Sequence, residues 1–165
     1  MKNELTYKDL NALISFACGH PKGRRLYPIV VESHADFIDV FATDSHIALA
    51  LTLQGITYGS GEAFSVPAKS AVGNQSQPVP ADFLRYLSDP EGHEWAHRLP
   101  MPDPTGACPP NTYGAGVLVT ACQLMKRLGC ENVTVDSSSS GKLLLHGVSD
   151  DGKRDAVMQV MYRVR

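Results

Sequence analysis

The chain has 165 residues, a formal net charge of −2 and 43% hydrophobic residues. This length suits one domain with its own core. A strongly basic total would have indicated a nucleic-acid-binding protein, and this net charge does not. No apolar run approaches the ~20 residues of a membrane helix, and the polar residues 1–4 lead into no signal region, so we expect a cytoplasmic protein. The four cysteines form no C-x-x-C pair, and we expect reduced thiols.

The first half of the chain has the pattern of one helix followed by strands. A helix is predicted over 7–18, because Thr6 and Asp9 form a capping-box pattern and apolar residues then recur at helical spacing. Asp44, Ser45 and His46 could be taken for a hydrolytic triad, but three consecutive residues cannot converge on one reacting atom, so we predict a tight turn here. The predicted strands are 26–33, 37–43, 46–53 and 63–66.

A segment over 71–112, rich in proline, glycine and polar residues, is interpreted as a linker. Within it we expect a short helix over 81–87, while the prolines of 99–110 predict an extended connector.

The second half repeats the first. A helix is predicted over 117–128, ended by Gly129. The strands predicted after it are 132–135, 142–148 and 154–164.

This repetition predicts one α+β domain over 1–165, with repeat one over about 1–70 and repeat two over about 113–165. Each repeat is a helix followed by a β-meander, and each is too small to be stable alone. Two such units side by side would form a continuous antiparallel sheet with both helices packed on one face. The outer faces of the helices would then be free for another task.

Four short segments carry a resemblance. They are GHPKGRRLYPI at 19–29, FATDSHIA at 41–48, FSVPAK at 64–69 and VMQVMYRVR at 157–165. In this order they are similar to segments of the bacterial DNA polymerase III beta subunit family, the DNA sliding clamps, although the last lacks the family's proline and 73–111 has no counterpart. The resemblance implies a clamp-like domain whose helices line the inner surface of a ring. The family has three domains per chain, whereas this chain has one.

The resemblance also implies DNA-contacting residues. These are the basic loop residues Lys22, Arg24 and Arg25 at the inner rim, and Lys126 and Arg127 on the second helix. Cations along a surface can meet duplex phosphates without any catalytic geometry. The alternative is that these residues serve solvation and the helix dipole.

The function expected from this is a non-enzymatic, sliding-clamp-like protein. It would bind or encircle duplex DNA non-specifically as a replication accessory or processivity factor, self-associate, and need no cofactor. The alternative is a clamp-fold interaction module that binds a replication protein in place of DNA.

A third hypothesis comes from His93, Glu94 and His97, which match the zinc-hydrolase pattern H-E-x-x-H. Pro90 and Pro100 leave room for only about two helical turns. No third ligand follows at a fitting distance, so this is the least favoured function and we predict no metal site.

Overall fold

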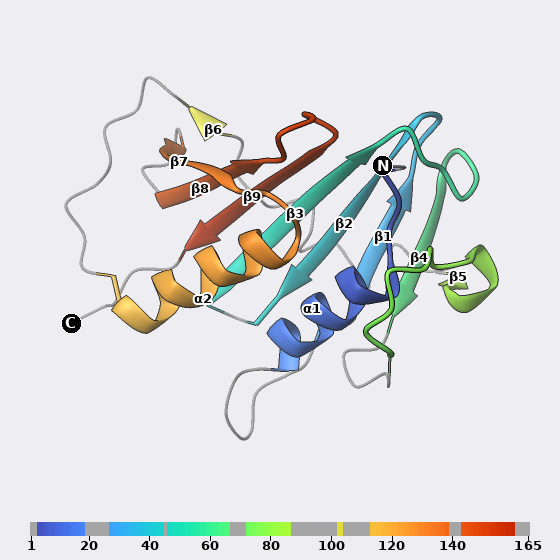
Figure 1. Ribbon diagram of the computed structural model, residues 1–165, viewed down its shortest axis with the longest axis horizontal. Helices are drawn as coiled ribbons and strands as arrows, with labels where there is room; N and C mark the ends of the chain where they lie inside the picture. The colour runs from blue at the N-terminus through green and yellow to red at the C-terminus, as the bar shows by residue number, and fades with distance from the viewer. Residues whose placement is uncertain are drawn as a thin grey trace.

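The computed structural model describes residues 3–18, 27–44, 46–66, 72–86, 102–103, 113–138 and 143–160. Figure 1 shows both α-helices on one face of a single sheet. Of the helices in these ranges, none has the length and apolarity needed to cross a membrane. In chain order the elements are α1 (Tyr7–Cys18), β1 (Ile29–Ser33), β2 (Phe37–Thr43), β3 (Ile47–Gln54), β4 (Glu62–Val66), the 3-10 helix η1 (Ala81–Phe83), β5 (Arg85–Tyr86), β6 (Pro102–Asp103), α2 (Ala115–Arg127), β7 (Asn132–Ser138), β8 (Leu143–Val148) and β9 (Arg154–Val160).

The described strands form one sheet in the order β5-β4-β1-β2-β3-β9-β8-β7-β6, and its paired strands are antiparallel. The two halves of the chain meet where β3 pairs with β9, in a register that runs from Ile47↔Val160 to Leu53↔Arg154. The predicted α+β class, with two helices and an antiparallel sheet, is confirmed.

The core lies between the helices and one face of the sheet. Along β3 the buried residues Ile47, Leu49, Leu51 and Leu53 alternate with less buried ones, as expected for a strand with one face on the core. They belong to the same apolar cluster as Leu13 of α1 and residues of α2. Burying one such side chain contributes about 1.5–3 kcal/mol, so this layer supplies most of the driving force for folding.

The start of α1 is fixed by reciprocal hydrogen bonds. The N–H of Thr6 donates to Asp9 Oδ2 (2.9 Å), and the N–H of Asp9 donates to Thr6 Oγ1 (3.2 Å). This is the capping box that the sequence predicts, with a shorter acid in the usual position of Glu or Gln.

The same carboxylate also joins the two halves. Arg154 at the start of β9 donates from Nη1 to Asp9 Oδ1 (2.8 Å) and to the carbonyl of Leu128 (2.9 Å). It also donates from Nη2 to the carbonyl of Glu4 (2.9 Å) and from Nε to Asn3 Oδ1 (3.2 Å). One guanidinium therefore links the start of α1, the end of α2 and the sheet.

The short helix predicted over 81–87 is wrong. A 3-10 turn ends at Phe83, and Leu84 is extended and buried. Residues Arg85 and Tyr86 then pair with β4 as strand β5. The ladder with β4 and the burial of Leu84 outweigh the local helical pattern. The segment predicted as a linker thus supplies β5 and β6, the outermost strands of the described sheet.

Smaller differences concern boundaries. The helix predicted from residue 117 begins at Ala115, and the strand predicted to end at residue 135 continues to Ser138. The strand predicted from residue 26 begins, within the described residues, at Ile29.

Candidate nucleic-acid interface

The last turn of α2 carries two neighbouring exposed cations, Lys126 and Arg127. The helix ends after them because Gly129 has a φ of 78°, which glycine adopts at little cost. The N–H of Cys130 donates to the carbonyl of Met125 (3.0 Å) and the N–H of Gly129 donates to the carbonyl of Lys126 (3.1 Å), which is a Schellman motif. The predicted helix stop at Gly129 is confirmed.

Packing against β8 holds this helix end on the sheet. Met125 and Cys130 are buried over Gly147, where an added Cβ would lie 2.7 Å from Met125 Sδ and 3.0 Å from Cys130 Cβ. The missing side chain of Gly147 therefore lets α2 approach the strand closely. With the inner side of the turn packed in this way, Lys126 and Arg127 are held on the outer side.

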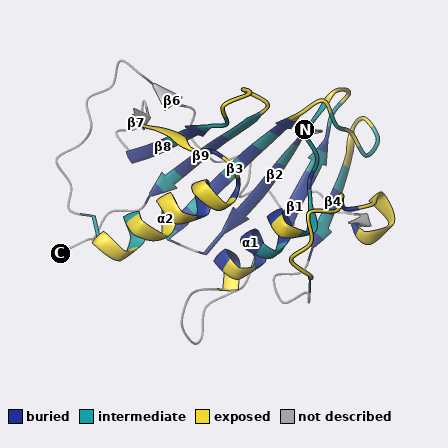
Figure 2. Ribbon diagram, viewed as in Figure 1, coloured by how far each residue is buried: buried dark blue, intermediate teal, exposed yellow. Residues whose placement is uncertain are grey.

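The outer faces of the two helices carry cations and no exposed carboxylate. Lys8 is exposed on the first turn of α1, and Lys126 and Arg127 are exposed on α2. The only acidic residue in either helix sequence is Asp9, which is buried against Arg154. Figure 2 shows that exposed residues follow the outer sides of both helices. None of the three cations forms a hydrogen bond or ion pair through its side chain with another described residue.

The opposite face of the sheet carries a row of acidic residues. Glu32, Asp39 and Asp155 alternate along their strands with the residues that face the helices, and the register Glu32↔Asp39↔Thr52↔Asp155 places them in one line across β1, β2, β3 and β9. Thr52 Oγ1 donates to Asp39 Oδ1 (2.6 Å), and His146 Nε2 lies 3.0 Å from Asp155 Oδ1. The helices themselves therefore expose cations while this row on the opposite face carries carboxylates, and one exposed carboxylate, Glu131, lies just beyond the end of α2.

Some predicted site residues lie outside the described residues, namely Lys22, Arg24, Arg25, His93, Glu94 and His97. The structure places Lys126 and Arg127 on α2 as predicted, at its exposed C-terminal turn. Sequence reasoning missed Lys8 and the acidic row. Lys8 could have been predicted from the sequence as an exposed residue in the first turn of α1. The acidic row could not, because it depends on strand register.

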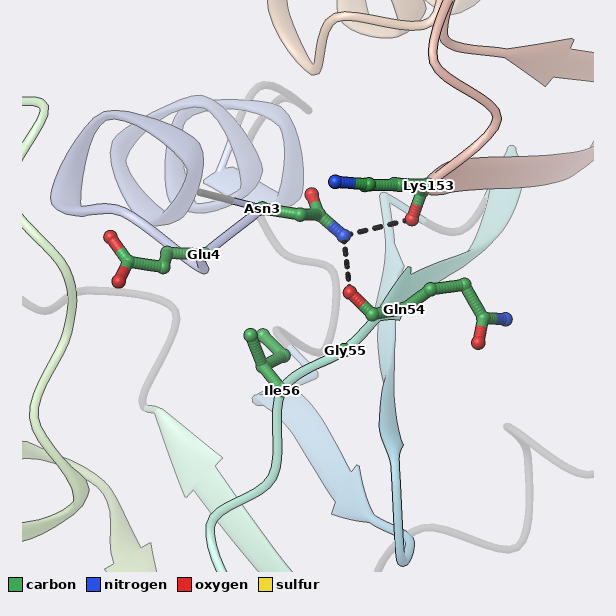
Figure 3. Close-up of a pocket in the computed structure, with 6 residues that line it drawn as sticks. All are labelled: Asn3, Glu4, Gln54, Gly55, Ile56 and Lys153. Carbon is green, nitrogen blue, oxygen red and sulfur yellow. Dashed lines mark hydrogen bonds between the residues drawn. The ribbon is translucent and has the colours of Figure 1, made fainter. Parts of the chain in front are cut away.

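An open cavity of about 430 Å³ lies near the start of α1, and Figure 3 shows the residues that line it. Asn3 Nδ2 donates to the carbonyls of Gln54 (2.8 Å) and Lys153 (2.9 Å), so the amide serves to hold two loops together. The charged side chains at its rim are of opposite sign, and they form no catalytic set. The lining residues are Asn3, Glu4, Gln54, Gly55, Ile56 and Lys153.

Two buried titratable groups, Tyr58 and Cys130, are held in their neutral forms. Burial raises the pKa of Tyr58 to about 12, and its hydroxyl donates to the carbonyl of Val79 (2.8 Å). Burial also raises the pKa of the Cys130 thiol to about 11, so it is not a thiolate at neutral pH. At the turn after β2, Asp44 Oδ1 accepts from the N–H groups of His46 (2.8 Å) and Ile47 (2.7 Å), which makes Asp44 a turn residue.

Comparison with known proteins adds little to this geometry. No protein-family model and no curated protein matches the chain. A solved structure from Eubacterium rectale, provisionally assigned as a DNA polymerase III beta subunit, is similar over 98% of this chain with 7% identity and a TM-score of 0.31. The chain spans 31% of that protein's length. At this identity and TM-score the likeness says nothing about activity, so function has to be argued from the residues of this chain.

Proposed function

We propose that this chain is a clamp-like, DNA-associated protein that contacts duplex phosphates non-specifically through its helix layer. It acts without catalysis, as an accessory to replication in the cytoplasm, and it self-associates. The two helix-plus-meander units act as repeats of one design, with the β3–β9 pairing between them.

The observation that carries this proposal is the segregation of charge between the two faces. Lys8, Lys126 and Arg127 lie on the outer sides of the helices, while Glu32, Asp39 and Asp155 lie behind the sheet. A polyanion approaching the acidic face would be repelled, and one approaching the helices would meet only cations on them. A net charge of −2 therefore does not oppose DNA contact, because the sign of the local surface decides the approach.

Cations at the end of a helix also stabilise the helix through its dipole. That role satisfies Lys126 and Arg127 without any ligand, but it does not explain Lys8, which lies at the opposite, positive end of α1. Lys8 is unfavourable for the dipole and exposed, so its position is better explained by a contact made outside the chain. The resemblance of the four sequence segments to sliding clamps also supports contact through the helices, because it implies helices that line the inner surface of a ring.

Fluorescence anisotropy of a labelled duplex across a salt series tests the proposal. Lys126→Gln/Arg127→Gln lowers the net charge by the same amount as Lys153→Glu, whose site is in the exposed turn before β9. We expect the double variant to bind more weakly and to lose about 0.9 from the slope of log K against log salt for each phosphate contact removed, while Lys153→Glu changes little. Arg24→Glu/Arg25→Glu tests the predicted loop in the same assay.

An absence of binding at low salt would overturn the proposal. Equal weakening by the double variant and by Lys153→Glu would show a response to net charge alone, which also contradicts a specific helix face. In either case the clamp-fold interaction module, with a replication protein as its partner, becomes the better explanation.

A further inference from the structure

A segment outside the helices runs alongside the start of α1. Residues 73–78, with the sequence GNQSQP and here called the strap, pass this helix end on the side of the sheet that carries the helices (Figure 1, green). The N–H of Tyr7 donates to the carbonyl of Gln77 (3.1 Å). The N–H of Lys8 donates to the carbonyl of Gln75 (2.8 Å). The strap therefore satisfies N–H groups that the first turn of a helix leaves unpaired, and it lies directly beside Lys8.

The strap is fixed at both ends. Before it, the carbonyl of Val72 accepts a hydrogen bond from Asn11 Nδ2 of α1 (3.0 Å). After it, Val79 is buried in the core and its N–H donates to the carbonyl of Leu5 (2.8 Å). The hydroxyl of Tyr58 donates to the carbonyl of Val79 (2.8 Å). Because its backbone is already held in place, the strap can contact a ligand with little loss of conformational entropy.

The side chains of the strap are polar, uncharged and exposed. All residues of the strap are exposed (Figure 2), and the four in its middle carry amide or hydroxyl groups that can donate hydrogen bonds: Asn74, Gln75, Ser76 and Gln77. None of these four side chains forms a hydrogen bond or ion pair with another described residue. Their donors are therefore available to a partner outside the chain.

The surroundings of these donors favour an anion. In the first turn of α1 the acidic residue is Asp9, which is buried and paired with Arg154 (2.8 Å), whereas Lys8 is exposed. The carboxylates of Glu4 and Asp82 come next along the two segments, and both lie beyond the hydrogen bond between Leu5 and Val79. Uncharged donors beside a cation suit phosphate oxygens, which accept hydrogen bonds from Asn, Gln and Ser side chains as well as from Lys and Arg.

We propose that the strap is a second phosphate-contacting surface, which binds the backbone of the same duplex as Lys8 through uncharged donors. This inference rests on the proposed function and extends it from the helices to a segment outside them. Hydrogen bonds from uncharged groups hold the duplex in place, but they neutralise no phosphate and release no counterion. The strap should therefore contribute affinity without salt dependence, which distinguishes its contribution from that of Lys8.

Fluorescence anisotropy of a labelled duplex across a salt series tests this signature. We expect Gln75→Ala/Gln77→Ala to bind about fivefold or more weakly at each salt concentration, with the slope of log K against log salt unchanged. Lys8→Gln should lose about 0.9 from that slope. Gln54→Ala is the matched control, because Gln54 is exposed and alternates with the buried Leu53, which places it on the side of the sheet away from the helices.

A gain of affinity separates direct contact from a merely structural role of the strap. Gln77→Lys and Gln54→Lys add the same charge at exposed positions. We expect Gln77→Lys to bind more tightly and to steepen the slope by about 0.9, while Gln54→Lys changes little. If the strap only supported α1, no such gain would occur.

The outcomes distinguish this inference from the proposed function. If the wild type binds DNA and the strap variants match it, or respond no more than the Gln54 variants, only this inference falls. If the wild type shows no binding at low salt, the proposed function falls and takes this inference with it.

Discussion

Both helices lie on the same face of the sheet (Figure 1), yet they are held very differently. Most of α1 is buried, including Leu10, Leu13 and Phe16, whereas α2 buries only Ala121, Leu124 and Met125 within its length. The start of α1 is closed by the Thr6–Asp9 capping box, while α2 begins at Gly114 with no side-chain cap. Figure 2 shows this contrast directly, with more of α2 exposed.

The difference indicates that the two halves contribute differently to stability and to the exposed surface. The first half supplies the larger part of the buried core, and the second half supplies the exposed cations of α2. A binding surface has to leave side chains exposed and available to a partner, whereas the side chains of a stabilising core are buried and packed against one another. Substitutions in the two halves should therefore differ in what they damage, and this can be measured.

The largest effect is expected from Asp9→Ala, which leaves the largely buried side chain of Arg154 (18% exposed) without its carboxylate partner. Loss of one member of a buried pair typically costs about 3–5 kcal/mol of unfolding free energy. Urea denaturation followed by circular dichroism measures it.

Lys8→Ala is the control next in sequence, and because Lys8 is exposed we expect a change within about 0.5 kcal/mol. Asp9→Leu/Arg154→Met removes both charges and should be less damaging than Asp9→Ala. A small loss for Asp9→Ala would contradict the role of this pair in joining the halves.

A second contrast compares apolar residues on the two helices. Leu13 of α1 is fully buried in the core, so Leu13→Ala should cost about 2–5 kcal/mol through lost burial and a residual cavity. Val119→Ala on the outer side of α2 should cost less than about 0.5 kcal/mol. Chemical denaturation of both variants at the same pH measures the two losses of unfolding free energy. Similar losses would contradict the proposed difference between the helices.

Stability at alkaline pH should depend on the thiol behind α2. Burial raises the pKa of Cys130 from 9.0 to about 11 in the folded chain. The unfolded chain therefore loses this proton first, so the contribution to the unfolding free energy is complete below pH 9 and declines as pH rises toward 11. The decline should amount to roughly 2–3 kcal/mol.

The measurement is the difference between wild type and Cys130→Ala in urea midpoint from pH 8 to 11, which removes the contribution of the other titrating groups. Cys122→Ala, at an exposed position of α2, is the control and should keep the wild-type slope. A difference curve that stays flat across this range would mean that Cys130 is solvated.

The smallest effects concern the helix starts. Thr6→Ala removes the capping hydroxyl of α1 and should cost about 1 kcal/mol. Gly114→Asp adds a capping side chain to α2, whose N-cap residue is already extended (φ −69°, ψ 126°), and should gain a few tenths of a kcal/mol. Thermal melts of both variants measure these changes in stability. A loss of stability with Gly114→Asp would show that an aspartate at residue 114 does not cap α2.

Much of the fold follows from local pattern. A few neighbouring residues determine each of three features, and each is confirmed: the capping box at Thr6, the helix stop at Gly129 and the alternating burial along β3. The contribution of residues 85–86 to the sheet could not be predicted, because two residues carry too little strand pattern and their conformation depends on pairing with β4.

The candidate site was predictable to a lesser degree. Lys126 and Arg127 were predicted as DNA contacts from the resemblance to sliding clamps, and the structure places both in the last turn of α2. The acidic row of Glu32, Asp39 and Asp155 was not, since it exists only in the register of strands that are brought together by tertiary pairing.

The pairing of β3 with β9 has a consequence for how the chain folds. It joins residues 47–53 to residues 154–160, so this ladder can form only after a long loop has closed. Until then, β3 is an unpaired edge strand that carries the core residues Leu49 and Leu51. We expect this docking to be the slow step and the undocked first half to be the species that aggregates. Pulse-labelling hydrogen exchange during refolding should find the amides between β1 and β2 protected before those of β9.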